Sequence, residues 1–344
     1  MITASRPNVL ITSVGRRNLL LRFFREALAG RGQLFAADMS DSAPALVEAD
    51  RGMLVPPIGA EDYLRRVSDI CSDNAIGLVL SLNDLELPIL AGAKATFEDI
   101  GTQVVVPEPW VVECCFDKFR FCEEMTVRGI PVAPTFNDTQ SALGAISTGS
   151  IAFPLVVKPR WGTASIGVEV VDNEHELEEA VSWLRRRLAR SMVGHIGRSS
   201  PEGQVVIQQA LQGDECGLDI VNDLEGRPMA VLARRKLSMR AGETDRAISI
   251  VDARLEEVGF RLSRVFEHPG VADCDVFLTP SGPVVLEVNP RFGGGYPFSQ
   301  LAGADVPGAL VDWFLDGTTR RPLSLRPGVI AAKCDGVLEI KNGR

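Results

Sequence analysis

Short apolar runs alternate with amphipathic segments through the first hundred residues. The apolar runs, typical of buried strands, lie at 9–14, 33–38, 76–82 and 102–107. Residues 17–30 and 61–74 carry apolar side chains at helical spacing, and 85–101 is predicted to be a helix broken early by Pro88. Because strands alternate with helices, this part of the chain is predicted to form a parallel α/β sheet with crossover helices.

The pattern changes from about residue 113, where strands begin to follow one another directly. Helices are predicted at 116–131, 173–190 and 253–267, and a polar, glycine-rich loop at 191–204. Residues 150–171 predict two strands joined by a loop. Further strands, predicted to be antiparallel, lie at 205–211, 216–223 and 228–237, in a hairpin within 273–290, and in a closing pair within 328–340. The second part of the chain is therefore α+β.

Composition narrows the class of protein. A chain of 344 residues suits two or three packed subdomains, and 45% hydrophobic with 24% charged residues is typical of a globular protein. The net charge of −9 argues against a general affinity for nucleic acid. We find no apolar run long enough for a membrane and no signal-peptide pattern at the start, so we expect a cytoplasmic protein. Seven cysteines without zinc spacing are expected to be reduced, mostly buried thiols.

The stretch DVFLTPSGPVVLEVNPRFGGGYP (275–297) carries the strongest chemical signal. Glu287 and Asn289 point the same way from one strand, and Asp275 on the preceding strand can come alongside. Two carboxylates and an amide oxygen form a hard site that suits Mg²⁺ bound to phosphates. Arg291 can present a planar cation to an acyl phosphate, and Gly293 to Gly295 can let backbone N–H groups approach an anion. Taken alone, this motif also fits a surface hairpin with solvated acids.

Two lysines precede that stretch. Lys118 lies on the helix at FDKFR, and Lys158 ends the apolar strand FPLVVKP, where a lysine is costly without an anionic partner. The following loop carries small residues whose amides can cover phosphates, namely Gly162, Thr163, Ala164, Ser165 and Gly167. Each lysine alone is more simply a solvated amine. The order of lysine, lysine with a small-residue loop, and paired acids is harder to obtain by chance.

Other polar positions are compatible with a nucleotide. The strand end at Gln208, Gln209, Ala210 and Leu211 exposes backbone groups that can read an adenine edge, and Glu215 can accept ribose hydroxyls or be a plain turn acid. Residues 234–249 hold five cations around a glycine, either an anion site or a solvated loop.

In the first part of the chain, Gly15 and Asp38 follow strands without the glycine pattern of a nicotinamide site. The nearby edge of the sheet at Asn83, Asp84 and Glu86 can still hold a small ligand.

Taken together, these residues resemble the ATP-grasp superfamily, and within it the group similar to the carbamoyl-phosphate synthase large chain and single-chain carboxylate–amine ligases. The matching pieces are ITSVGRR, SLNDLE, Asp117-Lys118, VVKPRWGTASIGV, QQALQGDE and EVNPRFGGGYP. The resemblance implies an N-terminal parallel α/β (pre-ATP-grasp) domain, a small lid subdomain and a C-terminal antiparallel-sheet domain. The expected boundaries are 1–112, 113–190 and 191–320, with a closing segment at 321–344.

The same resemblance implies roles for individual residues. Lys118 and Lys158 correspond to ATP-phosphate lysines, residues 160–167 to the lid loop, and Gln208 to Leu211 to the adenine hinge. Glu215 corresponds to the ribose acid, although the hinge often carries a Glu where this chain has two glutamines. The remaining roles fall to Lys236 and Arg291 as catalytic residues, and to Asp275, Glu287 and Asn289 as magnesium ligands.

The reaction expected from this resemblance is ATP- and Mg²⁺-dependent, with Mn²⁺ able to substitute. A small-molecule carboxylate is phosphorylated and then joined to an amine, giving an amide, ADP and phosphate, in a protein expected to be a homodimer. One alternative is a carboxyphosphate-type enzyme that activates bicarbonate. Another is a non-catalytic nucleotide-binding module, against which the acid pair and Arg291 argue.

Overall fold

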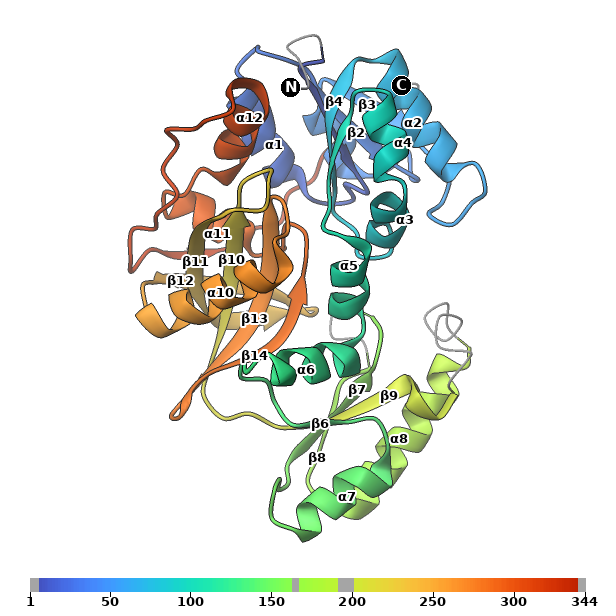
Figure 1. Ribbon diagram of the computed structural model, residues 1–344, viewed down its shortest axis with the longest axis vertical. Coiled ribbons are helices and arrows are strands. Elements are labelled where there is room, and N and C mark those ends of the chain that lie inside the picture. Colours follow the sequence, from blue (N-terminus) through green and yellow to red (C-terminus); the bar gives the residue numbers. More distant parts are fainter. Residues whose placement is uncertain (1–5, 163–166, 191–200, 340–344) are drawn as a thin grey trace.

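A computed structural model of the protein describes residues 6–162, 167–190 and 201–339. Its strands form three sheets of five, six and four strands. Figure 1 shows the five-stranded sheet at the top beside the six-stranded sheet, and the four-stranded sheet at the far end below them. The helices α5 (Pro109–Phe116) and α6 (Lys118–Val127) connect the top of the molecule to the small sheet. No helix in the described ranges is long and apolar enough to cross a bilayer.

The N-terminal sheet is parallel, in the order β3-β2-β1-β4-β5. Alternate residues of β1 face opposite cores, because Val9 and Ile11 pack on the side of α1 while Leu10 packs on the side of α2. The predicted parallel α/β domain is therefore confirmed. Its elements are β1 (Asn8–Thr12), α1 (Asn18–Leu28), β2 (Leu34–Asp38), the 3-10 helix η1 (Pro44–Glu48), β3 (Arg51–Leu54), α2 (Tyr63–Asp73), β4 (Ile76–Ser81), α3 (Leu87–Gly92), α4 (Lys94–Asp99) and β5 (Gln103–Val105).

Two local predictions in this domain were wrong. The helix expected at 85–101 is two short helices, α3 and α4, divided at Ala93, and Pro88 lies in the first turn of α3, where proline is tolerated. The edge strand β3 was missed because none of its residues is fully buried, so it lacks a continuous apolar run.

The small sheet is antiparallel, in the order β6-β9-β7-β8. The two strands predicted within 150–171 are present as β7 and β8, and the helix predicted at 173–190 is α8. β9 lies beyond the boundary expected at 190, yet it pairs with β7. The elements are β6 (Thr135–Phe136), α7 (Thr139–Ser147), β7 (Leu155–Pro159), β8 (Glu169–Val171), α8 (Glu174–Leu188), the 3-10 helix η2 (Pro201–Gln204) and β9 (Val205–Gln209).

The large sheet is antiparallel throughout, in the order β14-β13-β10-β11-β12-β15. The hairpin predicted within 273–290 is confirmed. The solvated loop considered at 234–249 is instead a long hairpin of β11 and β12, and the closing pair expected within 328–340 is the single strand β15 in the described part. The elements are β10 (Asp214–Asn222), β11 (Pro228–Arg240), β12 (Glu243–Ile250), α10 (Ala253–Phe266), β13 (Val271–Thr279), β14 (Gly282–Asn289), α11 (Tyr296–Leu301), α12 (Val306–Asp316) and β15 (Ile330–Ala332).

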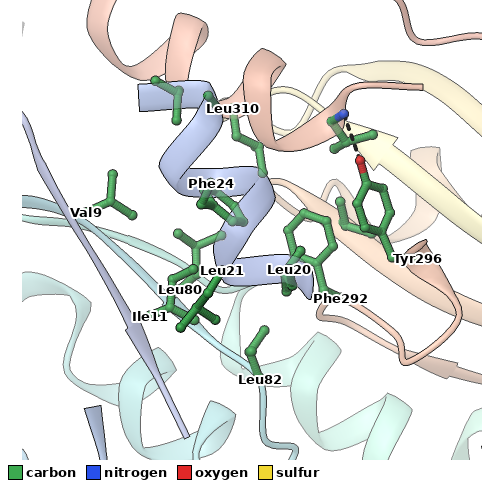
Figure 2. Close-up of a cluster of buried hydrophobic side chains, with 14 of the residues drawn as sticks. Val9, Ile11, Leu20, Leu21, Phe24, Leu80, Leu82, Phe292, Tyr296 and Leu310 are labelled. Atoms are coloured by element: carbon green, nitrogen blue, oxygen red, sulfur yellow. Dashed lines mark hydrogen bonds between the residues drawn. The ribbon is translucent and has the colours of Figure 1, made fainter. Parts of the chain in front are cut away.

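A shared core holds the N-terminal sheet against the large-sheet domain. Phe24 of α1 is fully buried and meets Phe292 edge to face, with ring centroids 5.8 Å apart. Figure 2 shows Leu20, Phe24 and Leu310 of α12 gathered in this core. Because these side chains come from both ends of the chain, the core fixes the position of the N-terminal sheet relative to the large sheet.

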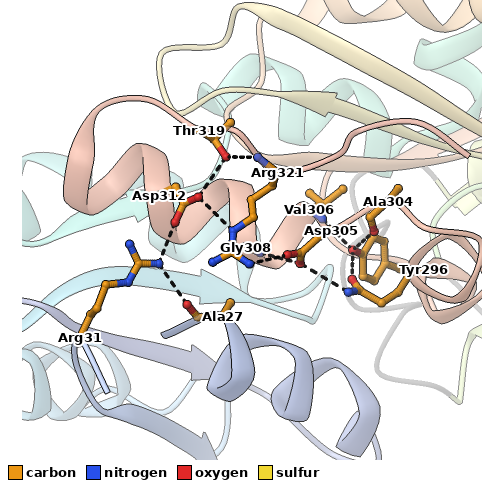
Figure 3. A network of polar contacts seen from close by, with 11 residues as sticks. Ala27, Arg31, Tyr296, Ala304, Asp305, Val306, Gly308, Asp312, Thr319 and Arg321 are labelled. Atoms are coloured by element: carbon orange, nitrogen blue, oxygen red, sulfur yellow. Dashed lines mark hydrogen bonds and ion pairs between the residues drawn. The ribbon is translucent and has the colours of Figure 1, made fainter. Parts of the chain in front are cut away.

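A polar network beside this core reinforces the contact. Arg31, just after α1, pairs with Asp312 of α12 at 2.7 Å. Asp312 also pairs with Arg321, which reaches Asp305 at the start of α12. Figure 3 shows this chain of contacts continuing toward Tyr296, whose hydroxyl accepts the backbone N–H of Val306. Because these pairs share partners, they fix the orientation of α12 relative to the end of α1.

Removal of the Phe24 ring is expected to destabilise the whole chain. Phe24→Ala should lower the free energy of unfolding by about 3–5 kcal/mol, since it leaves a cavity in the shared core. Denaturant unfolding measures the change. Leu19→Ala on the same helix, at an exposed position, should stay within about 0.5 kcal/mol of the parent. Equal effects of the two variants would contradict the packing described.

Candidate functional site

Four polar side chains share one face of the β13–β14 hairpin. Asp275 lies directly opposite Glu287, and Asp273 lies directly opposite Asn289. Opposite residues in an antiparallel pair, and residues two apart along a strand, point to the same side. The structure thus brings together Asp275, Glu287 and Asn289. It adds Asp273, which sequence reasoning missed although it stands two residues before Asp275.

The same alternation extends across the large sheet. Glu215, Gly217 and Asp219 of β10 lie beside the acids of β13, and Arg234 and Lys236 of β11 lie beside β10. The residues between them face the other side and form an apolar core under α10, including Cys216, Leu218, Cys274 and Val276. One face of the sheet is therefore a packed core, and the other carries opposite charges in neighbouring positions.

Lys236 joins two of the acids. Its ammonium lies 2.7 Å from a carboxylate oxygen of Glu215 and 2.7 Å from one of Asp275. Burial opposes its charge, but Asp275 and Glu215 outweigh the burial and raise the pKa of Lys236 above its ordinary value. Lys236 is consequently a fixed cation in the middle of the site.

Lys118 and Lys158 approach the acids from the lid side. Lys118 begins α6, and its ammonium lies 3.7 Å from Glu287 and donates to the carbonyl oxygen of Gly162. Lys158 of β7 lies opposite Val206 of β9, and Val156 lies opposite Gln208. Since residues two apart along a strand point to the same side, Lys158 and Gln208 share one face of the small sheet. Lys158 is buried, and this burial lowers its pKa despite the opposing charge of Glu287.

The two acids at the centre differ in electrostatic environment. Burial raises the pKa of Asp275 to about 6, against the opposing effect of Lys236. Burial also acts on Glu287, but Lys118, Lys158, Lys236 and Arg291 together lower its pKa below the ordinary value. Glu287 is therefore held as a carboxylate at neutral pH by the cations around it.

A pocket opens next to these residues, between the N-terminal domain and β14. Its lining includes Asp84, Lys118, Gly162, Glu287 and Asn289. Arg291 donates to Asp84 at 2.6 Å and to the carbonyl oxygen of Phe292. Its Nε is buried and has no hydrogen-bond partner among the described residues. The guanidinium of Arg291 therefore keeps one donor that the described residues do not use.

Arg234 neutralises two acids on this charged face. It is nearly fully buried and pairs with Asp219 at 2.7 Å and Asp273 at 2.9 Å. A Cβ at Gly295 would lie 2.4 Å from Arg234, and one at Gly293 would lie 2.2 Å from Asp273. The sequence predicted that these glycines let an anion approach the backbone. The structure shows in addition that Gly293 and Gly295 make room for the protein's own charged side chains.

The other residues predicted to bind nucleotide lie at the end of β9 and in the loop after β7. The side chain of Gln208 donates to the hydroxyl of Thr135, and that of Gln209 donates to the carbonyl oxygens of Ala152 and Pro154. The two amide side chains thus hold the end of β9 in place, and Ala210 and Leu211 follow directly. Gly162 lines the pocket, whereas Thr163, Ala164 and Ser165 lie outside the described residues.

The donor set fits a magnesium ion that keeps part of its shell for phosphates. Within the described ranges, no three His, Cys, Asp or Glu side chains group closely enough to hold a metal on their own. What the hairpin offers is the Asp275 and Glu287 carboxylates with the Asn289 amide on one face. Mg²⁺ commonly takes one or two carboxylates and completes its octahedron with waters and phosphate oxygens.

The fold is that of an ATP-grasp protein, with a parallel N-terminal sheet followed by two antiparallel sheets. Residues 9–105 match the family model "PylC-like, N-terminal domain". Residues 202–337 match the model "ATP-grasp in the biosynthetic pathway with Ter operon". Residues 202–337 thus match an ATP-grasp family, and the fold of the chain is the ATP-grasp fold.

Curated and solved proteins agree with this fold. The chain is 30% identical over 206 residues to the uncharacterized protein y4rH of Sinorhizobium fredii, and the match spans 57% of this chain but only 40% of that protein. The biotin carboxylase domain of the 2-oxoglutarate carboxylase from Hydrogenobacter thermophilus superposes with a TM-score of 0.70 and 16% identity, over 92% of this chain and 71% of that one. The L-amino acid ligase from Bacillus licheniformis superposes with a TM-score of 0.67 and 21% identity, over 90% and 75%.

Loss of the Arg234 cation is expected to destabilise the sheet strongly. Arg234→Met should cost about 3–5 kcal/mol of unfolding free energy, because Asp219 and Asp273 keep their buried charges without a counter-ion. Chemical denaturation reports the change. Arg235→Met, at the next position and half-exposed, should cost less than about 1 kcal/mol. A parent-like Arg234→Met would show that the buried pairs are not needed.

Proposed function

We propose that the protein is an ATP-dependent ligase that joins a carboxylate to the amine of an amino acid. The proposal is supported by two lysines, two acids and an arginine that meet at one site. Lys118 and Lys158 approach from the lid side, Asp275 and Glu287 from the large sheet, and Arg291 stands beside them. This arrangement supplies cations for phosphates, oxygen ligands for magnesium and a guanidinium for a developing anion.

The reaction follows in two balanced steps. A carboxylate oxygen attacks the γ-phosphorus of ATP, the bond to the bridging oxygen breaks, and ADP leaves with an acyl phosphate formed. The amine nitrogen then attacks the acyl carbon and inorganic phosphate leaves, while the nitrogen gives up a proton. The products are an amide, ADP and phosphate, without a covalent bond to the protein.

The chain's own residues position and neutralise charge in these steps. We place Lys118 and Lys158 on the phosphates, and Lys236 and Arg291 where charge develops on the transferring phosphoryl group and the acyl oxygen. Asp275, Glu287 and Asn289 would hold Mg²⁺, which would supply positive charge to neutralise the phosphates. The end of β9 at 208–211 and Glu215 are placed on the adenine and ribose. We place the reaction in the cytoplasm, because all seven cysteines are free and six of them are buried.

A second candidate is a carboxyphosphate-type reaction with bicarbonate as the carboxylate. The observation in its favour is the likeness in fold to the biotin carboxylase domain that was solved with MgADP and bicarbonate. Bicarbonate alone would then stimulate ADP release in the absence of any organic carboxylate. A ligase for organic acids would respond to the organic carboxylate and leave bicarbonate without effect.

Neutralising Glu287 should remove activity without unfolding the protein. Glu287→Gln is expected to lower carboxylate-dependent ADP release at least about 100-fold, because the amide no longer supplies the charge that neutralises the magnesium and lysines. Glu225→Gln, in an exposed turn, should keep the parent rate. A screen of ADP release against pools of carboxylates and amines provides the assay. Near-parent turnover by Glu287→Gln would refute the role.

Shortening Arg291 should affect the chemical step. Arg291→Ala is expected to lower kcat at least about 100-fold while changing the KM for ATP much less, since its guanidinium is placed on charge that forms during reaction. Steady-state kinetics with saturating carboxylate separate the two constants. A rise of about 100-fold in the KM for ATP with an unchanged kcat would assign Arg291 to nucleotide binding instead.

A further inference from the structure

Two charged side chains from distant parts of the chain meet over Gly294. Arg17 follows the first strand of the N-terminal sheet, and Glu243 begins β12. A Cβ on Gly294 would lie 2.4 Å from a guanidinium nitrogen of Arg17 and 3.0 Å from a carboxylate oxygen of Glu243. Glycine leaves room for both groups here, and any larger residue would have to displace the Arg17 guanidinium, although the backbone conformation is ordinary.

The pair is loosely engaged. The closest approach between the Arg17 guanidinium and Glu243 is 3.6 Å, longer than a hydrogen bond, and their side chains are 28% and 48% exposed. The tight contact of Glu243 is with Lys333, at 2.6 Å. Pairs elsewhere on this sheet are shorter, such as Lys236 with Asp275 at 2.7 Å and Arg234 with Asp273 at 2.9 Å. Arg17 therefore keeps donors that an external anion can take.

Arg17 also lies next to the reactive part of the site. Burial lowers its pKa from the ordinary value, Glu243 opposes that change, and the charges of Arg291, Asp273 and Asp84 all act on it. Gly294 is three residues from Arg291 in the chain. A group held by Arg17 thus sits beside the arginine placed on the acyl phosphate.

The turn that carries Arg17 is held firmly by the sheet. The backbone N–H of Gly15 donates to Asp38 at 2.8 Å, and that of Arg17 donates to the carbonyl oxygen of Val14 at 2.9 Å. Leu20 and Leu21, in the following turn, are buried in the shared core. A binding group on such a rigid support loses little entropy when a ligand binds.

We propose that Arg17 and Glu243 bind the head group of the acceptor, which is an α-amino acid. Arg17 takes its α-carboxylate with the planar fork of the guanidinium, and Glu243 faces its α-amine, so the nitrogen is presented toward the acyl phosphate near Arg291. This assignment rests on the proposed ligase function and names the two residues that hold the acceptor in it.

The proton balance of the second step is compatible with this arrangement. The bound α-ammonium carries three protons and the amide product keeps one. Of the two that leave, one goes to water before attack, and the other is taken up by the departing phosphate. Glu243 holds the ammonium before that loss and is exposed enough to be in contact with water.

The experiment compares acceptors and separates the two half-reactions. With a carboxylate pool identified by ADP release, L-alanine is compared with ethylamine, the amine that lacks the carboxylate. Hydroxylamine in place of an acceptor traps the acyl phosphate as a hydroxamate. We expect alanine-type acceptors to react at least about 10-fold better than their decarboxylated amines. We expect Arg17→Met to raise the acceptor KM about 10- to 100-fold, with hydroxamate formation within about 2-fold of the parent.

Controls distinguish binding from structure. Arg22→Met, on the helix that follows Arg17 but paired with Glu48 away from the site, should keep the parent acceptor KM, and Arg17→Lys should fall between parent and Arg17→Met. If Arg17→Met does not fold, Arg17→Lys and Glu243→Gln carry the same comparison.

Three results would overturn the assignment: an unchanged acceptor KM in these variants, equal use of ethylamine, or a matching loss of hydroxamate. A parent protein that forms neither ADP nor hydroxamate with any carboxylate would instead refute the ligase function itself.

Discussion

The large sheet depends on a strict alternation between an apolar face and a charged face. On one side, residues such as Cys216 and Val276 are buried under α10. On the other, charged residues lie next to opposite charges, so that Arg234 stands between Asp219 and Asp273 and Lys236 between Glu215 and Asp275. Burying any of these charges without its partner would cost several kcal/mol, so the face is stable only as a set. The same face carries Asp275 and Glu287, the two acids placed on magnesium.

The second requirement is that the N-terminal domain stays fixed relative to this sheet. The shared core around Phe24 and the Arg31–Asp312 network hold it there. As a result, Asp84 reaches Arg291 although 207 positions separate them in the chain. The N-terminal domain thus contributes directly to the site, because it orients the arginine and lines the pocket.

Much of the fold follows from local sequence. The period-two and helical patterns predicted the parallel domain and the acid-bearing hairpin, and the structure confirms both. The strand β12 was missed because its charged residues, such as Glu243 and Arg246, hide the alternation in a segment rich in cations. The resemblance located Lys118, Lys158 and the acids. The partners Asp84, Asp273 and Arg17 could not be assigned to their contacts, since these depend on packing between elements far apart in sequence.

In the proposed reaction, the substrate carboxylate becomes an acyl phosphate beside these residues. Labelling both oxygens of the carboxylate substrate with oxygen-18 and analysing the released phosphate by mass spectrometry tests it directly. We expect each inorganic phosphate to carry one labelled oxygen, because the carboxylate oxygen that attacked phosphorus leaves with it. Phosphate without label, formed at the same rate as product, would contradict an acyl phosphate intermediate.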